Sequence, residues 1–219
     1  MTGRRMRTAG FAWAVLFTLF LFCIGCSRTE VNPVQSPPPD VIARCQGLSD
    51  ARRNHLYILV INGFDPTEVT NSVGLAHFLE QSGFPNVYYT QQRKAWEFEQ
   101  RILDIKQSDP AARIAFVCYS MGVCYGRKLA EKLKSDGAQV DLLLYLDVFA
   151  FNHRPEHSPD DARRIVNIIT EPRLGIFGSE PLAGAVNYQY LGLRHVKVPS
   201  DSRIIERVLQ ELTDLANAA

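Results

Sequence analysis

The sequence predicts an α/β protein, in which a doubly wound, mostly parallel sheet carries helices on both faces. Short apolar runs such as 55–61 (HLYILVI) and 140–146 (VDLLLYL) are typical of strands buried on both faces. Segments with helical spacing of apolar residues stand between these runs, as in βαβ units. The 24 basic and 23 acidic residues are scattered along the chain, which excludes the basic face of a nucleic-acid binder.

The first half of the folded part is expected to alternate three strands with two helices. The strands are predicted at 55–61, 87–90 and 113–118. A helix over 71–81 has apolar residues at helical spacing and is ended by Gly83. A second helix over 96–105 carries Phe98, Ile102 and Ile105 on one stripe. These segments predict the βαβαβ start of a parallel sheet.

The second half continues the alternation with three more strands. A helix follows the strand at 113–118 and is expected to end near residue 134. The next strands are predicted at 140–146, 164–169 and 186–191. An amphipathic helix over 202–215 closes the domain, so both faces of the sheet receive a helical cover.

Residues 1–25 are predicted to be a secretory signal peptide. Three arginines precede an unbroken apolar run over 11–24, whose length is nearer a signal-peptide core than a membrane-spanning helix. The sequence CIGC at 23–26 resembles a bacterial lipobox, which implies a lipidated Cys26 at the mature N-terminus. We therefore expect an exported lipoprotein, anchored by acyl chains in the cell envelope on the periplasmic or outer side.

A Pro-rich segment follows the predicted lipidation site. We expect residues 26–40 to form an extended tether of about 40 Å, and residues 41–219 to form the folded domain. Loss of residues 1–25 leaves 21 basic and 23 acidic residues, so net charge should not draw the mature protein to anionic lipid.

The strongest chemical motif is Cys118-Tyr119-Ser120-Met121-Gly122, at the junction of a strand and a helix. A sharp turn there would lift the serine above the carboxyl edge of the sheet, and it tolerates only small residues two positions away. Gly122 meets this demand, whereas Cys118 stands where glycine is usual. The motif predicts Ser120 as a nucleophile.

Two further residue types needed for nucleophilic catalysis follow later strands. His195 lies between the last strand and the last helix, where an imidazole can reach the serine as general base. Asp147 directly follows a buried strand and has no basic neighbour in sequence, so a histidine partner would stabilise it. Glu171, one strand later, is the alternative acid.

These residues together resemble the α/β-hydrolase superfamily, specifically its compact lipase-, esterase- or thioesterase-like members. The resemblance implies an α/β-hydrolase fold with a minimal cap and a triad of Ser120, Asp147 and His195. It also implies an oxyanion hole from the amides of Met121 and of Phe64 or Gly63. The implied function is hydrolysis of an ester or thioester of a lipid or small acyl group. The alternative is a catalytically inactive lipoprotein that binds a ligand or partner through the same fold.

No cofactor, metal or nucleic-acid partner is expected. His153 and His157 are separated by Pro155, which prevents a helix from aligning both on a metal ion. Cys45, Cys118 and Cys124 are too few for a disulfide scaffold and lack metal-site spacing. The expected partners are a small-molecule acyl substrate and, through the lipid anchor, the membrane.

Overall fold

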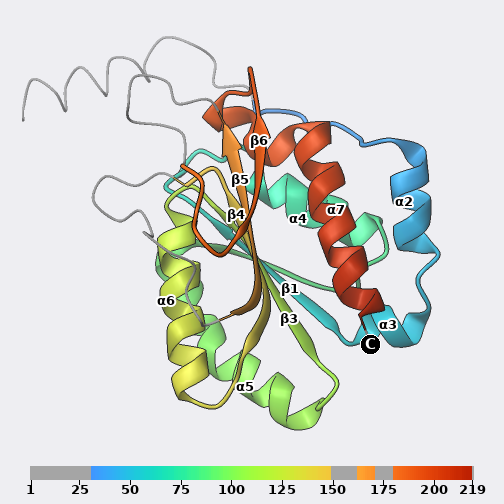
Figure 1. Ribbon diagram of the computed structural model, residues 1–219, viewed down its shortest axis with the longest axis vertical. Helices are drawn as coiled ribbons and strands as arrows, with labels where there is room; N and C mark the ends of the chain where they lie inside the picture. The colour runs from blue at the N-terminus through green and yellow to red at the C-terminus, as the bar shows by residue number, and fades with distance from the viewer. Residues whose placement is uncertain (1–30, 149–161, 171–179, 219) are drawn as a thin grey trace, which may run out of the picture. The chain divides into compact units, whose positions relative to one another are not determined.

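The computed structural model describes residues 31–148, 162–170 and 180–218, and Val31–Ala219 form one compact unit. Within these ranges six strands form a single sheet in the order β2-β1-β3-β4-β5-β6, and every neighbouring pair is parallel (Figure 1). The strands are β1 (Leu56–Asn62), β2 (Asn86–Gln91), β3 (Arg113–Tyr119), β4 (Val140–Leu146), β5 (Ala162–Thr170) and β6 (Val186–Tyr190). The predicted α/β class and parallel sheet are confirmed.

Helices lie on both faces of this sheet. On one face are α2 (Pro39–Gln46), α4 (Ser72–Gln81) and α7 (Ser202–Asn217), and on the other are α5 (Phe98–Ser108) and α6 (Gly122–Ser135) (Figure 1). The short elements are α3 (Asp50–Asn54) and the 3-10 helices η1 (Gln92–Glu97) and η2 (His195–Ser200). Successive side chains of β3 pack alternately into the two cores, which explains why its sequence is continuously apolar.

The strand order reverses between β1 and β3, which places a crevice at their carboxyl ends. From β1 the chain passes outward to β2, whereas from β3 it passes in the opposite direction to β4. In open α/β sheets, ligands bind outside the carboxyl ends of the strands at such a reversal. The loops that follow Asn62 and Tyr119 are therefore the expected location of a functional site.

The segment 31–40 differs from the predicted tether, because it packs on the domain. The Asn32 side-chain amide donates to the carbonyls of Val69, at 2.7 Å, and of Val196, at 2.9 Å. The Gln35 amide donates to the Ser200 carbonyl at 2.9 Å. Pro39 is the first residue of α2, a position where its missing N–H costs nothing. The described residues 31–40 therefore belong to the packed domain.

The predicted helix over 96–105 corresponds to two elements in the structure. The 3-10 helix η1 begins at Gln92, and α5 follows it from Phe98. The two N-terminal helices α2 and α3 were not predicted. In the ranges that the structure describes, no helix has the length and apolar character needed to cross a bilayer.

Candidate active site

Ser120 occupies a tight turn between β3 and α6. Its φ of 55° lies in the left-handed region that non-glycine residues seldom adopt, so the backbone is strained at this residue. Two backbone hydrogen bonds hold the turn: the Ser120 amide donates to the Leu146 carbonyl at 3.1 Å, and the Val123 amide donates to the Ser120 carbonyl at 3.2 Å. The side chain is thereby presented at the carboxyl edge of the sheet.

Two glycines allow the neighbouring backbone to approach Ser120. A Cβ on Gly63 would lie 2.8 Å from the Ser120 Cβ, and a Cβ on Gly122 would collide with the Ile61 carbonyl oxygen. Only residues without a side chain fit these two positions. The close packing of the β1 loop against the Ser120 turn therefore depends on both glycines.

Cys118 fits the turn because Gly126 faces it from α6. The Cys118 side chain is completely buried, and a Cβ on Gly126 would overlap its Sγ. Burial raises the pKa of the Cys118 thiol far above its usual 9.0, so the group remains a neutral, unreactive packing residue. The size of Cys118 is accommodated by the helix and leaves the turn intact.

His195 joins Ser120 to Asp147 through a continuous chain of hydrogen bonds. The Nε2 atom lies 2.9 Å from the Ser120 Oγ, and Nδ1 lies 2.7 Å from an Asp147 carboxylate oxygen. A carboxylate only accepts hydrogen bonds, so Nδ1 carries a proton; in the neutral tautomer with that proton, Nε2 accepts from the Ser120 hydroxyl. This tautomer leaves Nε2 able to remove the Ser120 proton.

Asp147 is fully buried and is the last residue in this series of hydrogen bonds. It follows β4 directly, with a φ of 49°, and its amide donates to the Ile168 carbonyl at 2.9 Å. The carboxylate also accepts the Thr170 amide at 3.2 Å and the Thr170 hydroxyl at 2.7 Å. With the His195 bond, these donors offset the cost of burying the charge. The alternative acid, Glu171, lies outside the described residues.

Tyr119 packs against the His195 imidazole, and the sequence analysis did not assign it a role in the site. Its ring stacks on His195 with centroids 4.9 Å apart, and its hydroxyl donates to the His195 carbonyl at 3.0 Å. Burial, aided by the charges of Asp147 and Asp65, raises the pKa of Tyr119 well above its usual value. The phenol therefore stays protonated and keeps donating. Its position directly before the serine was the signal available in the sequence.

The three predicted oxyanion donors differ in their hydrogen bonding. The Gly63 amide already donates to the Asn62 side-chain oxygen at 2.8 Å, so it is engaged. Within the described ranges, the amides of Phe64 and Met121 donate to no protein acceptor. An amide without a protein acceptor near a nucleophilic serine is available to bind a developing negative charge. The structure therefore favours Phe64 over Gly63 as the second donor.

Asn62 is a buried polar hub that the sequence analysis did not identify as part of the site. Its side-chain oxygen also accepts the Ser72 hydroxyl at 2.9 Å, and its amide donates to the Tyr89 hydroxyl at 3.0 Å. Tyr89 in turn donates to Glu68 at 2.5 Å. This network ties the end of β1 to β2 and α4, and fixes the loop that carries Phe64.

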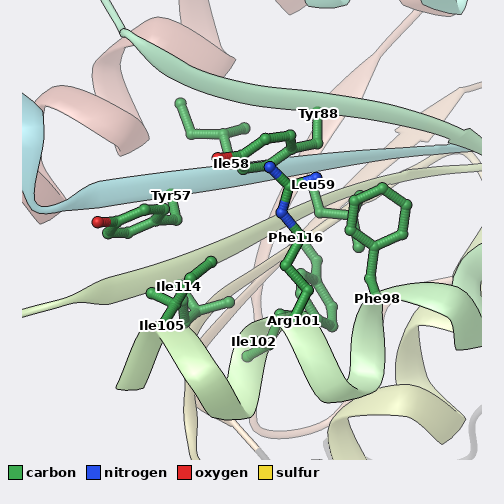
Figure 2. A pocket seen from close by; sticks show the side chains of 10 residues that line it. All are labelled: Tyr57, Ile58, Leu59, Tyr88, Phe98, Arg101, Ile102, Ile105, Ile114 and Phe116. Carbon is green, nitrogen blue, oxygen red and sulfur yellow. The ribbon is translucent and has the colours of Figure 1, made fainter. Parts of the chain in front are cut away.

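Two cavities lined by described residues away from Ser120 offer no comparable chemistry. One, of about 10 Å³, lies between α5 and the sheet, where the Arg101 guanidinium covers the Tyr88 ring at 4.0 Å (Figure 2). A hollow of about 410 Å³ at the amino edge is lined by ion-paired groups, including Arg164 bound to Glu211 at 2.9 Å. Neither contains a serine, thiol or histidine in its lining.

The remaining candidate groups are placed as follows. His55 pairs with Asp109 at 2.8 Å and His77 with Glu80 at 3.1 Å, both at exposed positions. Cys45, Cys118 and Cys124 form no disulfide within the part of the chain that the structure describes. Among the described residues, no group of three or more His, Cys, Asp or Glu side chains could hold a metal ion. His153, His157 and the predicted lipidation site Cys26 lie outside those residues.

The site thus combines a strained serine, an imidazole oriented by a buried carboxylate, and two unengaged amides. Such an arrangement can activate a hydroxyl for attack on an acyl carbon and stabilise the resulting oxyanion. No protein-family model matches the chain, and no curated protein matches it either.

Proposed function

We propose that this protein is a serine hydrolase of the α/β-hydrolase type that cleaves esters or thioesters through an acyl-enzyme. The observation that carries the proposal is the hydrogen-bonded chain from Ser120 through His195 to Asp147, at 2.9 and 2.7 Å. The strained φ of Ser120 at a strand-to-helix turn supports it independently, because strain of this kind persists where the surrounding structure enforces it.

The reaction follows from the positions of these groups. His195 Nε2 takes the hydroxyl proton as Ser120 Oγ bonds to the acyl carbon, and the Phe64 and Met121 amides hold the oxyanion. Collapse of the tetrahedral adduct breaks the bond to the leaving group, which receives the proton from Nε2. Water then attacks the acyl-enzyme with His195 again acting as base, which releases the acid and restores Ser120.

The proposed location is the cell envelope, where acyl chains on Cys26 anchor the chain after removal of residues 1–25. The motif of three arginines, an apolar run and CIGC supports this part of the proposal. A compact lipase-, esterase- or thioesterase-like enzyme at that location would act on acyl esters or thioesters of lipids or small molecules.

Labelling with a fluorophosphonate tests the nucleophile and its base directly. The chain from residue 26, with Cys26→Ser to prevent acylation, retains the segment 31–40 that packs on the domain. We expect the wild-type site to label, Ser120→Ala to abolish labelling, and His195→Ala to reduce its rate by at least about 10³-fold. A folded protein that stays unlabelled would favour the inactive, ligand-binding alternative.

Two further variants test whether Asp147 or Glu171 is the acid that orients His195. Asp147→Asn is expected to slow labelling by about 10³-fold or more, because a neutral amide no longer stabilises the imidazolium or enforces its tautomer, whereas Glu171→Gln should label at the wild-type rate. His55→Ala is the matched control, since His55 also pairs with an aspartate but has no serine beside it. If Glu171→Gln alone slows labelling, the acid assignment is wrong.

A further inference from the structure

Four apolar side chains project into solvent around the carboxyl edge of the sheet. Their exposed fractions are 48% for Val31, 64% for Phe64, 62% for Leu191 and 44% for Val196. We call these four residues the apolar rim. Exposed apolar groups gathered at one place on a protein mark an interaction surface more often than single ones do.

Each rim residue is adjacent in sequence to a residue that contacts the proposed active site or an element beside it. Phe64 follows Gly63, which packs against Ser120, and Val196 follows His195, which bonds to Ser120. Leu191 follows β6, whose last residue is paired with Thr170 beside Asp147. Val31 precedes Asn32, whose side chain bonds to the Val196 carbonyl. The four rim residues are therefore all tied, through an adjacent residue, to the carboxyl edge that carries the proposed active site.

Two exposed cations stand beside the rim without an ion pair to any described residue. Arg194 and Lys197 flank His195 and Val196 on the η2 segment. By contrast, the neighbouring Arg203 is held by Asp201 at 3.0 Å, and Arg164 is held by Glu211. Unpaired cations next to exposed apolar groups complement a membrane surface, whose anionic headgroups lie above an apolar interior.

The length of the chain before Val31 identifies the occupant of this surface. Only residues 27–30 separate Val31 from the predicted lipidation site at Cys26, and five extended residue steps span at most about 18 Å. Because Val31 is itself a rim residue, an acylated Cys26 would keep the rim close to the bilayer. The 40 Å tether expected from composition would have left the domain free to turn in any direction.

We propose that the apolar rim, with Arg194 and Lys197, docks on a bilayer that contains anionic lipid, so that Ser120 opens toward the membrane. The inference rests on the proposed hydrolase function, and it specifies the substrate class as acyl esters resident in that membrane. Docking adds apolar burial and headgroup attraction to the acyl anchor, although the mature chain has a net negative charge.

Vesicle co-sedimentation tests the docking face without the acyl anchor. The chain from residue 26 carrying Cys26→Ser is mixed with two kinds of vesicle. One contains phosphatidylcholine alone, and the other contains phosphatidylcholine with about 30% of the anionic lipid phosphatidylglycerol. We expect binding to the anionic vesicles, and a loss of about fivefold in the partition coefficient for each of Arg194→Gln and Lys197→Gln. Lys128→Gln, an exposed cation on α6, is the matched control and should bind as wild type does.

A matched pair of variants tests whether the apolar side chains of the rim contribute to vesicle binding. Leu191→Ser removes a rim side chain just after β6, whereas Val186→Ser removes an exposed apolar side chain at the other end of the same strand. We expect Leu191→Ser to lower partitioning at least about fivefold and Val186→Ser to leave it unchanged. Equal effects of the two changes would overturn the assignment of the face.

Fluorophosphonate labelling of the same samples separates the two proposals. If Ser120 labels but the chain does not bind vesicles, docking is wrong and the hydrolase proposal stands. If the chain binds vesicles through the rim but never labels, the hydrolase proposal fails while docking stands. Sedimentation of the free protein that shows a dimer abolished by Leu191→Ser would assign the rim to a second copy of the chain, and would also overturn docking on membranes.

Discussion

The Tyr119 hydroxyl donates to the His195 carbonyl at 3.0 Å while its ring stacks on the imidazole 4.9 Å away. The residue before the serine therefore fixes both the backbone and the ring of the histidine that contacts it. Because Tyr119 lies at the end of β3 and His195 begins η2, this contact connects the turn at Ser120 to the C-terminal part of the chain.

Tyr119→Phe removes the hydroxyl donor and keeps the stacked ring. We expect about 1 kcal/mol less stability in urea unfolding and about fivefold slower fluorophosphonate labelling, because the part-buried hydrogen bond from Tyr119 to the His195 carbonyl is lost. Tyr57→Phe is the control, since its hydroxyl contacts Asp109 at 3.4 Å away from the site. Equal labelling rates for Tyr119→Phe and wild type would show that the hydrogen bond does not position His195.

Gly126→Ala tests the contact that accommodates Cys118. The added Cβ would overlap the Cys118 Sγ, so we expect a loss of about 2 kcal/mol, although alanine normally stabilises a helix interior relative to glycine. Adding Cys118→Ala removes the sulfur, and the double variant should be at least about 1 kcal/mol more stable than the sum of the two single effects predicts. Additive effects in urea unfolding would contradict this account.

The buried thiol and phenol predict a loss of stability at alkaline pH. Burial raises the pKa of Cys118 above its usual 9.0 and the pKa of Tyr119 above its usual 10.0. Above those values the unfolded chain releases protons that the folded chain retains, so stability is full below about pH 9 and falls as pH rises. The melting temperature between pH 7 and 11 should decline less steeply in Tyr119→Phe than in wild type. Parallel profiles would refute the assignment.

Asn32→Ala tests the attachment of the N-terminal segment to the site. Its side-chain amide bridges the Val69 and Val196 carbonyls, so its loss should cost about 2 kcal/mol and slow labelling severalfold by loosening η2. Gln35→Ala is the comparison, because Gln35 is exposed, its bond to Ser200 comes from the backbone, and its side chain accepts the Ser202 amide only at a long 3.5 Å. If both variants unfold and label alike, Asn32 has no special role in holding η2.

Much of the fold could be predicted because its strands have continuous apolar sequences. The predicted and observed limits of β4 are both Val140–Leu146, and those of β1 differ by one residue at each end. The helices α2 and α3 were missed since they are short and polar, and the prolines before α2 suggested a tether. Pro39 at the first helical position was the available signal, but the Pro-rich composition of the segment before it concealed the helix.

The site residues also divide into those that the sequence could predict and those that required the structure. Ser120, Asp147 and His195 could be proposed together because parallel strands bring their carboxyl ends to one edge, whatever the distance in sequence. The Asn62 network could not, since it joins β1, β2 and α4 through side chains whose register only the fold determines. The choice of Phe64 over Gly63 likewise required knowing which amide Asn62 engages.

The bonds between the segment at Asn32 and η2 join residues more than 160 positions apart. During synthesis Asn32 and Gln35 are added more than 160 residues before their partners Val196 and Ser200. His195, the first residue of η2, is synthesised together with these partners. A nascent chain that ends before η2 therefore lacks His195, and the hydrogen-bonded series from Ser120 through His195 to Asp147 can form only after η2 has been synthesised.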